Sequence, residues 1–259
     1  MRINKFQSIL VASMVILFCV LYFGMKTKPK KQIAFEKSRA TNIEATGIQN
    51  VIMDAKKELT TEQLNIIEAM QSEYNNAKDD KKIIKAELLA SKWYEYKKPT
   101  VSGYYAEKIA NTLNTKDAWS IAGTTYSLAM QNAKSEKELK FSRGRAIKAL
   151  EKAISLEDNN ISDKINLALI YVDHPDKSPM EGIQMLLKLN QSNPDNVAVI
   201  NQLAKLAIRT NQTEKALKRL THALSVEPEN NNSICLIAEV YSMIGNKAKA
   251  IEFQNKCKK

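Results

Sequence analysis

Small and apolar residues recur in one register along the second half of the chain, in frames of about 34 residues. Counted from Val197, positions 7, 8, 20, 24, 27 and 32 are Leu203, Ala204, Ala216, Leu220, Ala223 and Pro228. Counted from Asn231, positions 7, 8, 11, 20 and 27 are Ile237, Ala238, Tyr241, Ala250 and Cys257. Two separate stretches therefore share one phase, which predicts paired helices.

Two earlier frames follow the same phase. In the first, Trp119, Ala122, Gly123 and Tyr126 mark the leading helix, and Ala146, Leu150 and Ala153 mark the second. About eleven extra residues stand between Gln131 and Phe141, as extra helical turns or as a loop. The next frame opens near Ile161 and has two prolines, Pro175 and Pro179, in a lengthened turn between its helices.

This phase resembles that of the tetratricopeptide repeat (TPR). Small residues at positions 8 and 20 let helices A and B of one repeat approach closely, and proline at 32 ends helix B. The resemblance implies an all-α, TPR-type helical-hairpin solenoid, which is a right-handed superhelix. We expect four TPR-like repeats within 116–259, namely 116–160, 161–196, 197–230 and 231–259.

The preceding residues 48–115 have helical spacing but a poor repeat phase. Thr60 and Gln63 have the spacing of a capping box, and Asp79 and Asp80 are candidate caps of a later helix. That later helix carries Ile84, Leu88 and Trp93, and a shorter one follows it with Tyr105, Ala106, Ala110 and Leu113. We therefore expect a helical capping region or degenerate repeats.

An uncharged run of 20 residues, Phe6 to Met25, lies near the amino terminus. As a helix it extends roughly 30 Å, enough to cross a bilayer once. A cleaved signal peptide needs small residues before the cut, and the run ends with the bulky Leu21, Tyr22 and Phe23. We expect a single transmembrane anchor at 1–25 and a polar, basic tether at 26–47.

The orientation of this anchor stays open. Four lysines follow it, at 26, 28, 30 and 31, and their charge favours a cytoplasmic domain. A short amino-terminal tail and a possible disulfide between Cys235 and Cys257 favour an extracytoplasmic or periplasmic one, because disulfides need an oxidising compartment. The alternative for these cysteines is two buried free thiols. We favour the extracytoplasmic arrangement.

The net charge of +11 is concentrated near the expected anchor. Residues 1–60 contain ten Lys/Arg and four Asp/Glu, whereas the other 199 residues contain 29 and 24. A basic run beside a membrane is attracted to anionic lipid head groups. No nucleic-acid recognition motif accompanies the charge, so we expect no nucleic-acid partner.

Residue combinations typical of catalysis are missing from the sequence. His174 and His222 are the two histidines, and neither has a cysteine or carboxylate at a known metal-motif spacing. No glycine-rich phosphate loop, C-x-x-C pair or nucleophile elbow occurs. We therefore expect a protein that is not an enzyme, with no cofactor, no metal and no small-molecule substrate.

The TPR resemblance implies where a partner protein would bind. In that family the concave groove is lined by helix A, which here gives Ser120, Thr124, Ser162, Ile165, Asn166, Leu169, Asn201, Lys205, Ile208 and Glu239. A carboxylate clamp of the co-chaperone type is disfavoured, because only Asn166 fits its pattern.

The combined features indicate a membrane-tethered scaffold or adaptor that binds a segment of a partner protein in this groove. One anchor followed by a repeat domain resembles the ancillary translocon subunit and the cytochrome c maturation scaffold of bacterial envelopes. The alternatives are a structural, self-assembling subunit of an envelope complex and a periplasmic assembly or chaperone-like factor. Tethering raises the effective concentration of a partner in the same thin layer, so a weak contact suffices.

Overall fold

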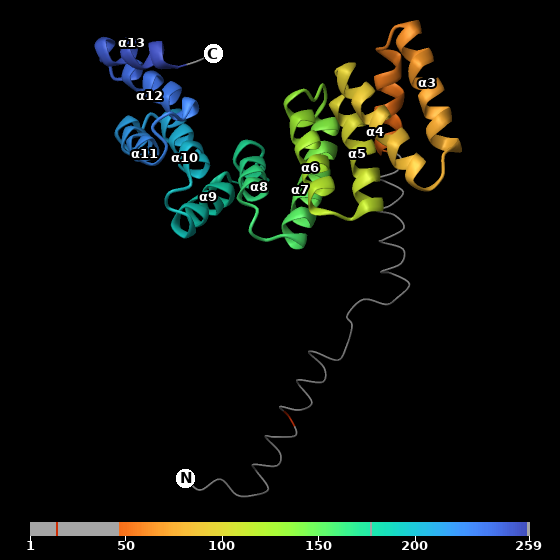
Figure 1. Ribbon diagram of the computed structural model, residues 1–259, viewed down its shortest axis with the longest axis horizontal. Coiled ribbons are helices and arrows are strands. Elements are labelled where there is room, and N and C mark those ends of the chain that lie inside the picture. The colour runs from red at the N-terminus through yellow and green to blue at the C-terminus, as the bar shows by residue number, and fades with distance from the viewer. Residues whose placement is uncertain (1–13, 15–46, 177, 258–259) are drawn as a thin grey trace, which may run out of the picture. The chain divides into compact units, whose positions relative to one another are not determined.

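The computed structural model describes residues 14, 47–176 and 178–257, and this part of the chain consists of helices joined by turns (Figure 1). The chain divides into two compact units, Met1–Asn50 and Val51–Lys259, and the repeats lie in the second unit. The helices with defined bounds are α3 (Thr61–Asn76), α4 (Asp79–Glu95), α5 (Pro99–Leu113), α6 (Lys116–Gln131), α7 (Glu136–Leu156), α8 (Ile161–Asp173), α9 (Met180–Ser192), α10 (Val197–Arg209), α11 (Thr213–Val226), α12 (Asn231–Met243) and α13 (Lys247–Lys256). Residues 47–57 are helical as well. Helices that follow one another in the sequence pack against each other.

Polar caps set the start of each helix A. Asn160, Asn196 and Asn230 precede α8, α10 and α12, and each side-chain oxygen accepts a hydrogen bond from the backbone N–H three residues on, at 3.1, 3.1 and 3.0 Å. Thr115 does the same for α6. Each cap satisfies a backbone donor that the helix leaves unpaired, which is worth about 1 kcal/mol.

Small residues allow helices A and B of each pair to touch. The helix-A members of this set are Gly123, Ala168, Ala204 and Ala238, the helix-B members are Ala146, Gly182, Ala216 and Ala250, and all eight are buried. A Cβ atom on Gly182 would lie 2.2 Å from the carbonyl oxygen of Ala168. Any side chain at this position would therefore push α8 and α9 apart. The helix pairs and their shared phase make this a TPR-like helical repeat fold.

The extra residues of the first pair form helical turns. Helix α6 has 16 residues and α7 has 21, whereas α8 and α9 have 13 each. The turn between α6 and α7 spans 132–135. Of the two expectations for the insertion, extra turns or a loop, the structure has extra turns.

The helices before the repeats start in different ways. Thr60 and Gln63 form a capping box, in which the Gln63 N–H donates to Thr60 Oγ1 at 3.2 Å and the Thr60 N–H donates to Gln63 Oε1 at 3.1 Å. The expectation that Asp79 or Asp80 caps α4 was wrong. The cap residue is Lys78, whose side chain makes no capping hydrogen bond. Both aspartates lie in the first turn of α4, where their negative charges interact favourably with the positive end of the helix dipole.

Of the three apolar residues expected on α4, Trp93 lies in the core of this region and Ile84 and Leu88 do not. The buried members of this core are Ala55, Ile67, Leu89, Trp93, Val101 and Tyr105. Ile84 and Leu88, expected to pack with Trp93, are instead 54% and 48% exposed. Leu113 is also exposed, at 45%. Helical spacing gave α4 two apolar faces, and α3 and α5 cover the one that contains Leu89 and Trp93.

No helix within 47–176 or 178–257 combines the length and the apolar character needed to cross a bilayer. Except for Met14, the anchor expected at 1–25 lies outside the residues that the structure describes. The tether expected at 26–47 lies outside them as well, apart from its last residue.

Candidate functional site: a cavity between helices α6 and α8

A cavity of about 350 Å³ lies between α6 and α8, the A helices of the first two repeats. The residues that α6 contributes include Thr124, Ser127, Leu128 and Gln131. The residues from α8 and its end include Asn166, Leu169, Asp173 and His174. The volume is at the lower end of the range for ligand pockets and is large enough for one or two side chains of a bound peptide.

The walls of this cavity are more apolar than their sequence indicates. The Thr124 hydroxyl donates to the carbonyl oxygen of Ser120 at 2.8 Å, and the Ser127 hydroxyl donates to that of Gly123 at 2.9 Å. Since both hydroxyl hydrogens are used by the backbone of α6, neither needs a partner in the cavity. Leu128 of α6 and Leu169 of α8 add apolar surface to the lining.

Asn166 is one of three polar residues of the cavity, with Gln131 and His174, whose side chains have free hydrogen-bonding capacity. Among the described residues, no hydrogen bond involves its side-chain amide. An amide offers two donors and an acceptor, which suits the backbone of an extended peptide. Asp173, on the same rim, is already paired, with Arg209 Nη1 of α10 at 2.7 Å.

Three of the residues expected to line a groove lie together in this cavity. They are Thr124, Asn166 and Leu169. Ser162 and Glu239 are exposed and Lys205 is half-buried, and these three lie outside the cavity.

Asn201 is closed to a partner. Its side chain is 1% exposed and accepts a hydrogen bond from the Ser233 hydroxyl at 2.9 Å. Its amide nitrogen lies 3.3 Å from Asn230 Oδ1, the oxygen that caps α12. Asn201 therefore links repeats three and four. It does not line an open groove, contrary to the expectation from the sequence.

Three other residues of the expected set serve packing. The Ser120 hydroxyl donates to Asp163 Oδ2 of the next repeat at 2.6 Å, and Asp163 is 2% exposed. Ile165 and Ile208 are each 7% exposed. These three side chains are therefore engaged in contacts within the fold.

Sequence reasoning missed Leu128, Gln131 and His174 as cavity residues. A signal for two of them was present, because Thr124, Leu128 and Gln131 are spaced i, i+4 and i+7 and share one face of a helix. His174 follows the last residue of α8, and its place in the cavity depends on where that helix ends.

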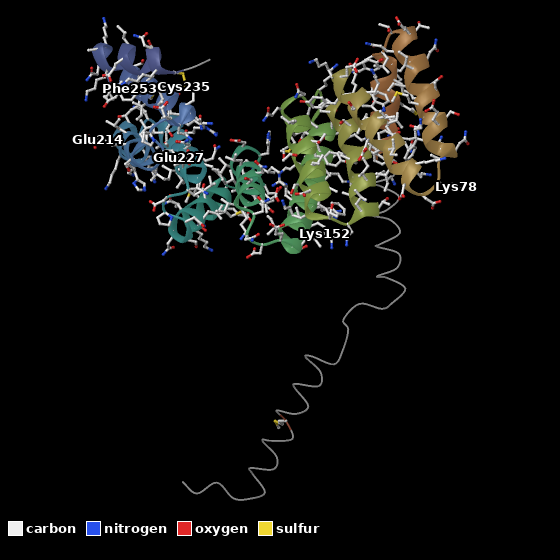
Figure 2. All side chains as sticks on the ribbon, viewed as in Figure 1. Lys78, Lys152, Glu214, Glu227, Cys235 and Phe253 are labelled. Atoms are coloured by element: carbon white, nitrogen blue, oxygen red, sulfur yellow. A yellow bond between two sulfur atoms is a disulfide. The ribbon has the colours of Figure 1, made fainter. Side chains whose placement is uncertain are left out.

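The structure joins Cys235 of α12 to Cys257, directly after α13, in a disulfide (Figure 2). The two Cα atoms are 4.9 Å apart, within the range that a disulfide spans without backbone movement. Both cysteines are partly exposed. The alternative of two buried free thiols does not describe them.

Neither histidine is part of a metal-ligand cluster in the described ranges, where no group of three or more His, Cys, Asp or Glu side chains is placed to hold an ion. His222 Nε2 lies 3.1 Å from Asp195 Oδ1 and 3.3 Å from the carbonyl oxygen of Pro194. His174 accepts a hydrogen bond at its backbone oxygen from Arg143 Nε at 2.7 Å.

Comparison with known proteins adds a distant likeness in fold. No protein-family model matches the chain, and no curated protein is significantly similar to it. Among solved structures, a crystal structure of MamA is 15% identical, covering 68% of this chain and 89% of that one with a TM-score of 0.44. MamA 41-end from Desulfovibrio magneticus RS-1 is 14% identical, covering 70% and 95% with a TM-score of 0.45.

The crystal structure of YrrB, described as a TPR protein with an unusual peptide-binding site, is 17% identical and covers 74% of this chain and 91% of that one, with a TM-score of 0.39. At such scores, the description of this chain as a TPR-like helical repeat protein rests on its own helix pairs and their phase.

Proposed function

We propose that this protein is a membrane-tethered interaction module that holds a segment of a partner protein in the cavity between α6 and α8. The observation that carries the proposal is the combination of an open apolar cavity of about 350 Å³ with an unpaired amide, Asn166, in its wall. Apolar walls supply binding energy, and a few polar groups fix the orientation of the bound chain.

The bound segment would place one or two apolar side chains between Leu128 and Leu169 and its backbone beside Asn166. The two leucines offer buried contact without hydrogen-bonding demands. A buried peptide group needs a partner for its N–H or C=O, and Asn166 can serve either.

Membrane tethering is supported by the uncharged run from Phe6 to Met25 and by the basic residues that follow it. An extracytoplasmic location of the repeats is supported by the disulfide between Cys235 and Cys257, because such bonds persist in oxidising compartments. Trapping free thiols in intact cells, followed by electrophoresis with and without reductant, tests the location. Both cysteines found as free thiols would count against it.

The binding proposal is tested by purifying the full chain with its associated proteins from cells that make either of two variants. Leu128→Lys places a charge in the cavity, whereas Leu156→Lys makes the same change at the end of α7; the two leucines are 40% and 41% exposed. The recovered amount of a protein that binds in the cavity should fall at least about tenfold with Leu128→Lys, which is the loss typical of an interface anchor. The recovered amount should be unchanged with Leu156→Lys. An associated protein set that Leu128→Lys does not change, in a folded variant, contradicts the proposal.

A structural, self-assembling role is the second candidate. It is supported by exposed apolar side chains on the last helix pair, where Met243, Ile244 and Ile251 are 43%, 48% and 57% exposed. Light scattering of the full chain separates the two roles. A stable oligomer that becomes a monomer with Ile251→Lys would favour self-assembly.

A further inference from the structure

One repeat lacks a residue that the other three share. Helices α6, α8, α10 and α12 begin at Lys116, Ile161, Val197 and Asn231. The eleventh residue of each helix is Tyr126, Tyr171, Ala207 and Tyr241, in that order. The third repeat therefore has alanine where the others have tyrosine.

In the first two repeats this tyrosine lies against the preceding helix B. A Cβ atom on Gly103 of α5 would be 2.8 Å from Tyr126 Cδ1, and the Tyr126 hydroxyl donates to Glu107 Oε2 of α5 at 2.9 Å. The Arg143 guanidinium of α7 lies 5.7 Å from the centre of the Tyr171 ring. The ring therefore fills the space between its own helix and the helix before it.

In the third repeat a cavity of about 180 Å³ occupies the corresponding place. Its walls include Ile183 and Leu187 from the preceding helix α9, Leu203 and Ala207 from α10, and Lys215 and Arg219 from α11. We name it the Ala207 socket. Pockets for whole small molecules are usually about 300–1,000 Å³, so the socket is sized for a single side chain.

The socket is also open to a partner. Leu187 is 43% exposed, whereas Leu203 and Ala207 are 4% and 5% exposed and form the floor. The socket shares no lining residue with the cavity between α6 and α8. A segment bound in one would leave the other accessible.

The mouth of the socket is positively charged. Lys215 and Arg219 are four residues apart on one face of α11. Lys215 Nζ donates to Gln212 Oε1 at 2.7 Å, and in the described ranges no acidic side chain pairs with Lys215 or Arg219. No acidic residue lines the socket. Two unneutralised cations favour a partner with carboxylates beside the inserted side chain.

We propose that the Ala207 socket binds one aromatic side chain from an acidic segment of a partner protein. The ring takes the place that tyrosine fills in the first two repeats, and the flanking carboxylates meet Lys215 and Arg219. Aromatic side chains inserted in pockets supply much of the affinity of protein interfaces, and charge complementarity at the rim speeds association and selects the partner.

The test uses the full chain and a fluorescein-labelled peptide of sequence Asp-Glu-Tyr-Glu-Asp, with anisotropy as the readout. Binding in the micromolar range is expected, and replacing the tyrosine of the peptide by alanine should weaken it at least about tenfold. Raising the salt concentration should weaken it further, because the rim charges are exposed to solvent.

Variants of the chain locate the binding. Ala207→Tyr fills the socket and should abolish binding while the protein keeps or gains thermal stability. Leu187→Glu and Arg219→Glu should each weaken binding at least about fivefold, because each makes the mouth less positive, and they serve in place of Ala207→Tyr if that variant does not fold. Lys152→Glu, an exposed position on α7 outside the lining, and Leu128→Lys, in the other cavity, should leave binding unchanged.

Three results would overturn the proposal. The peptide could fail to show saturable binding, the tyrosine and alanine peptides could bind equally well, or folded Ala207→Tyr could bind the peptide as the unchanged chain does. Loss of self-association of the chain on Ala207→Tyr, without peptide binding, would assign the socket to a second copy and would also overturn it. None of these results bears on the cavity between α6 and α8, whose own test uses Leu128→Lys.

Discussion

At the scale of single residues, two glycines in helices have opposite surroundings. Gly182 of α9 faces α8 so closely that a Cβ atom would be 2.2 Å from the carbonyl oxygen of Ala168 and 2.7 Å from the backbone nitrogen of Val172. A Cβ atom on Gly144 of α7 would meet nothing within 4 Å. The same substitution therefore has opposite consequences at the two sites.

We expect Gly182→Ala to lower the free energy of unfolding by at least about 1–3 kcal/mol, because a methyl group there forces two backbones apart. Gly144→Ala, the matched control, should raise it by about 0.5–1 kcal/mol, because alanine loses less entropy in a helix. Urea unfolding of both variants measures the difference. Equal stabilities would show that α8 and α9 do not pack as closely as described.

At the scale of elements, the last helix has little packing of its own. Of the ten residues of α13, Ala250 is the one that is buried. Tyr241 and Phe253 contact each other with ring centroids 5.7 Å apart, which adds one further contact between α12 and α13. The disulfide between Cys235 and Cys257 closes this pair of helices, with a sequence separation of 22 residues.

Reduction of this disulfide should loosen α13 while α10 stays intact. In the chain-entropy model a loop of this length contributes about 3 kcal/mol, which is large compared with the burial that α13 achieves. Hydrogen exchange should become faster across 247–256 after reduction, and in a Cys235→Ser, Cys257→Ser variant. Unchanged exchange there would mean that packing alone holds the helix.

The extended α6–α7 pair contacts the segment before α3. Lys134, in the turn between α6 and α7, and Lys98, before α5, both pair with Glu58. Hydrogen bonds from Lys134 and Lys98 lower the pKa of Glu58 from 4.5 to about 2. Thr100 also donates to Glu138 of α7 at 2.7 Å. Side-chain contacts thus connect the lengthened α6–α7 pair to the segments that precede the repeats.

Glu58 should therefore contribute to the pH dependence of stability. A carboxyl whose pKa is lower in the folded state stabilises the protein above its unfolded pKa of 4.5, and the contribution is lost as the pH falls towards 2. Glu58→Gln should make the loss of stability between about pH 5 and pH 2 shallower, and Lys134→Met should do so in part. The effect is modest because the Glu58 side chain is 41% exposed. An unchanged pH profile for Glu58→Gln would contradict it.

At the scale of the molecule, the sequence predicted the repeat fold well because its signal is local. Small residues such as Ala168 and Gly182 mark each helix contact, and asparagines such as Asn230 mark the start of a helix. Which helix-A residues stay open could not be read from the sequence, because Asn201 is closed by a contact with the next repeat. The same holds for Ile84 of α4, since two apolar faces compete and packing decides between them.

The cavities depend on distances between helices, which residue spacing does not give. The α6–α8 cavity lies at the ends of two helices, one of which is lengthened by the insertion. One sign of the Ala207 socket is present in the sequence, since Ala207 stands where the other three repeats have tyrosine. Its walls also need Ile183 and Leu187 of the preceding repeat, and their place beside Ala207 is not given by the sequence.

Site-specific photocrosslinking in living cells tests most directly whether the α6–α8 cavity holds a partner. A photoreactive residue at Gln131, on the cavity wall, is compared with one at Lys152, exposed on α7 and outside the cavity (Figure 2). We expect a discrete adduct from Gln131 that Lys152 does not give and that Asn166→Ala weakens. Identical adducts from the two positions, or an adduct from Lys152 alone, would contradict the account.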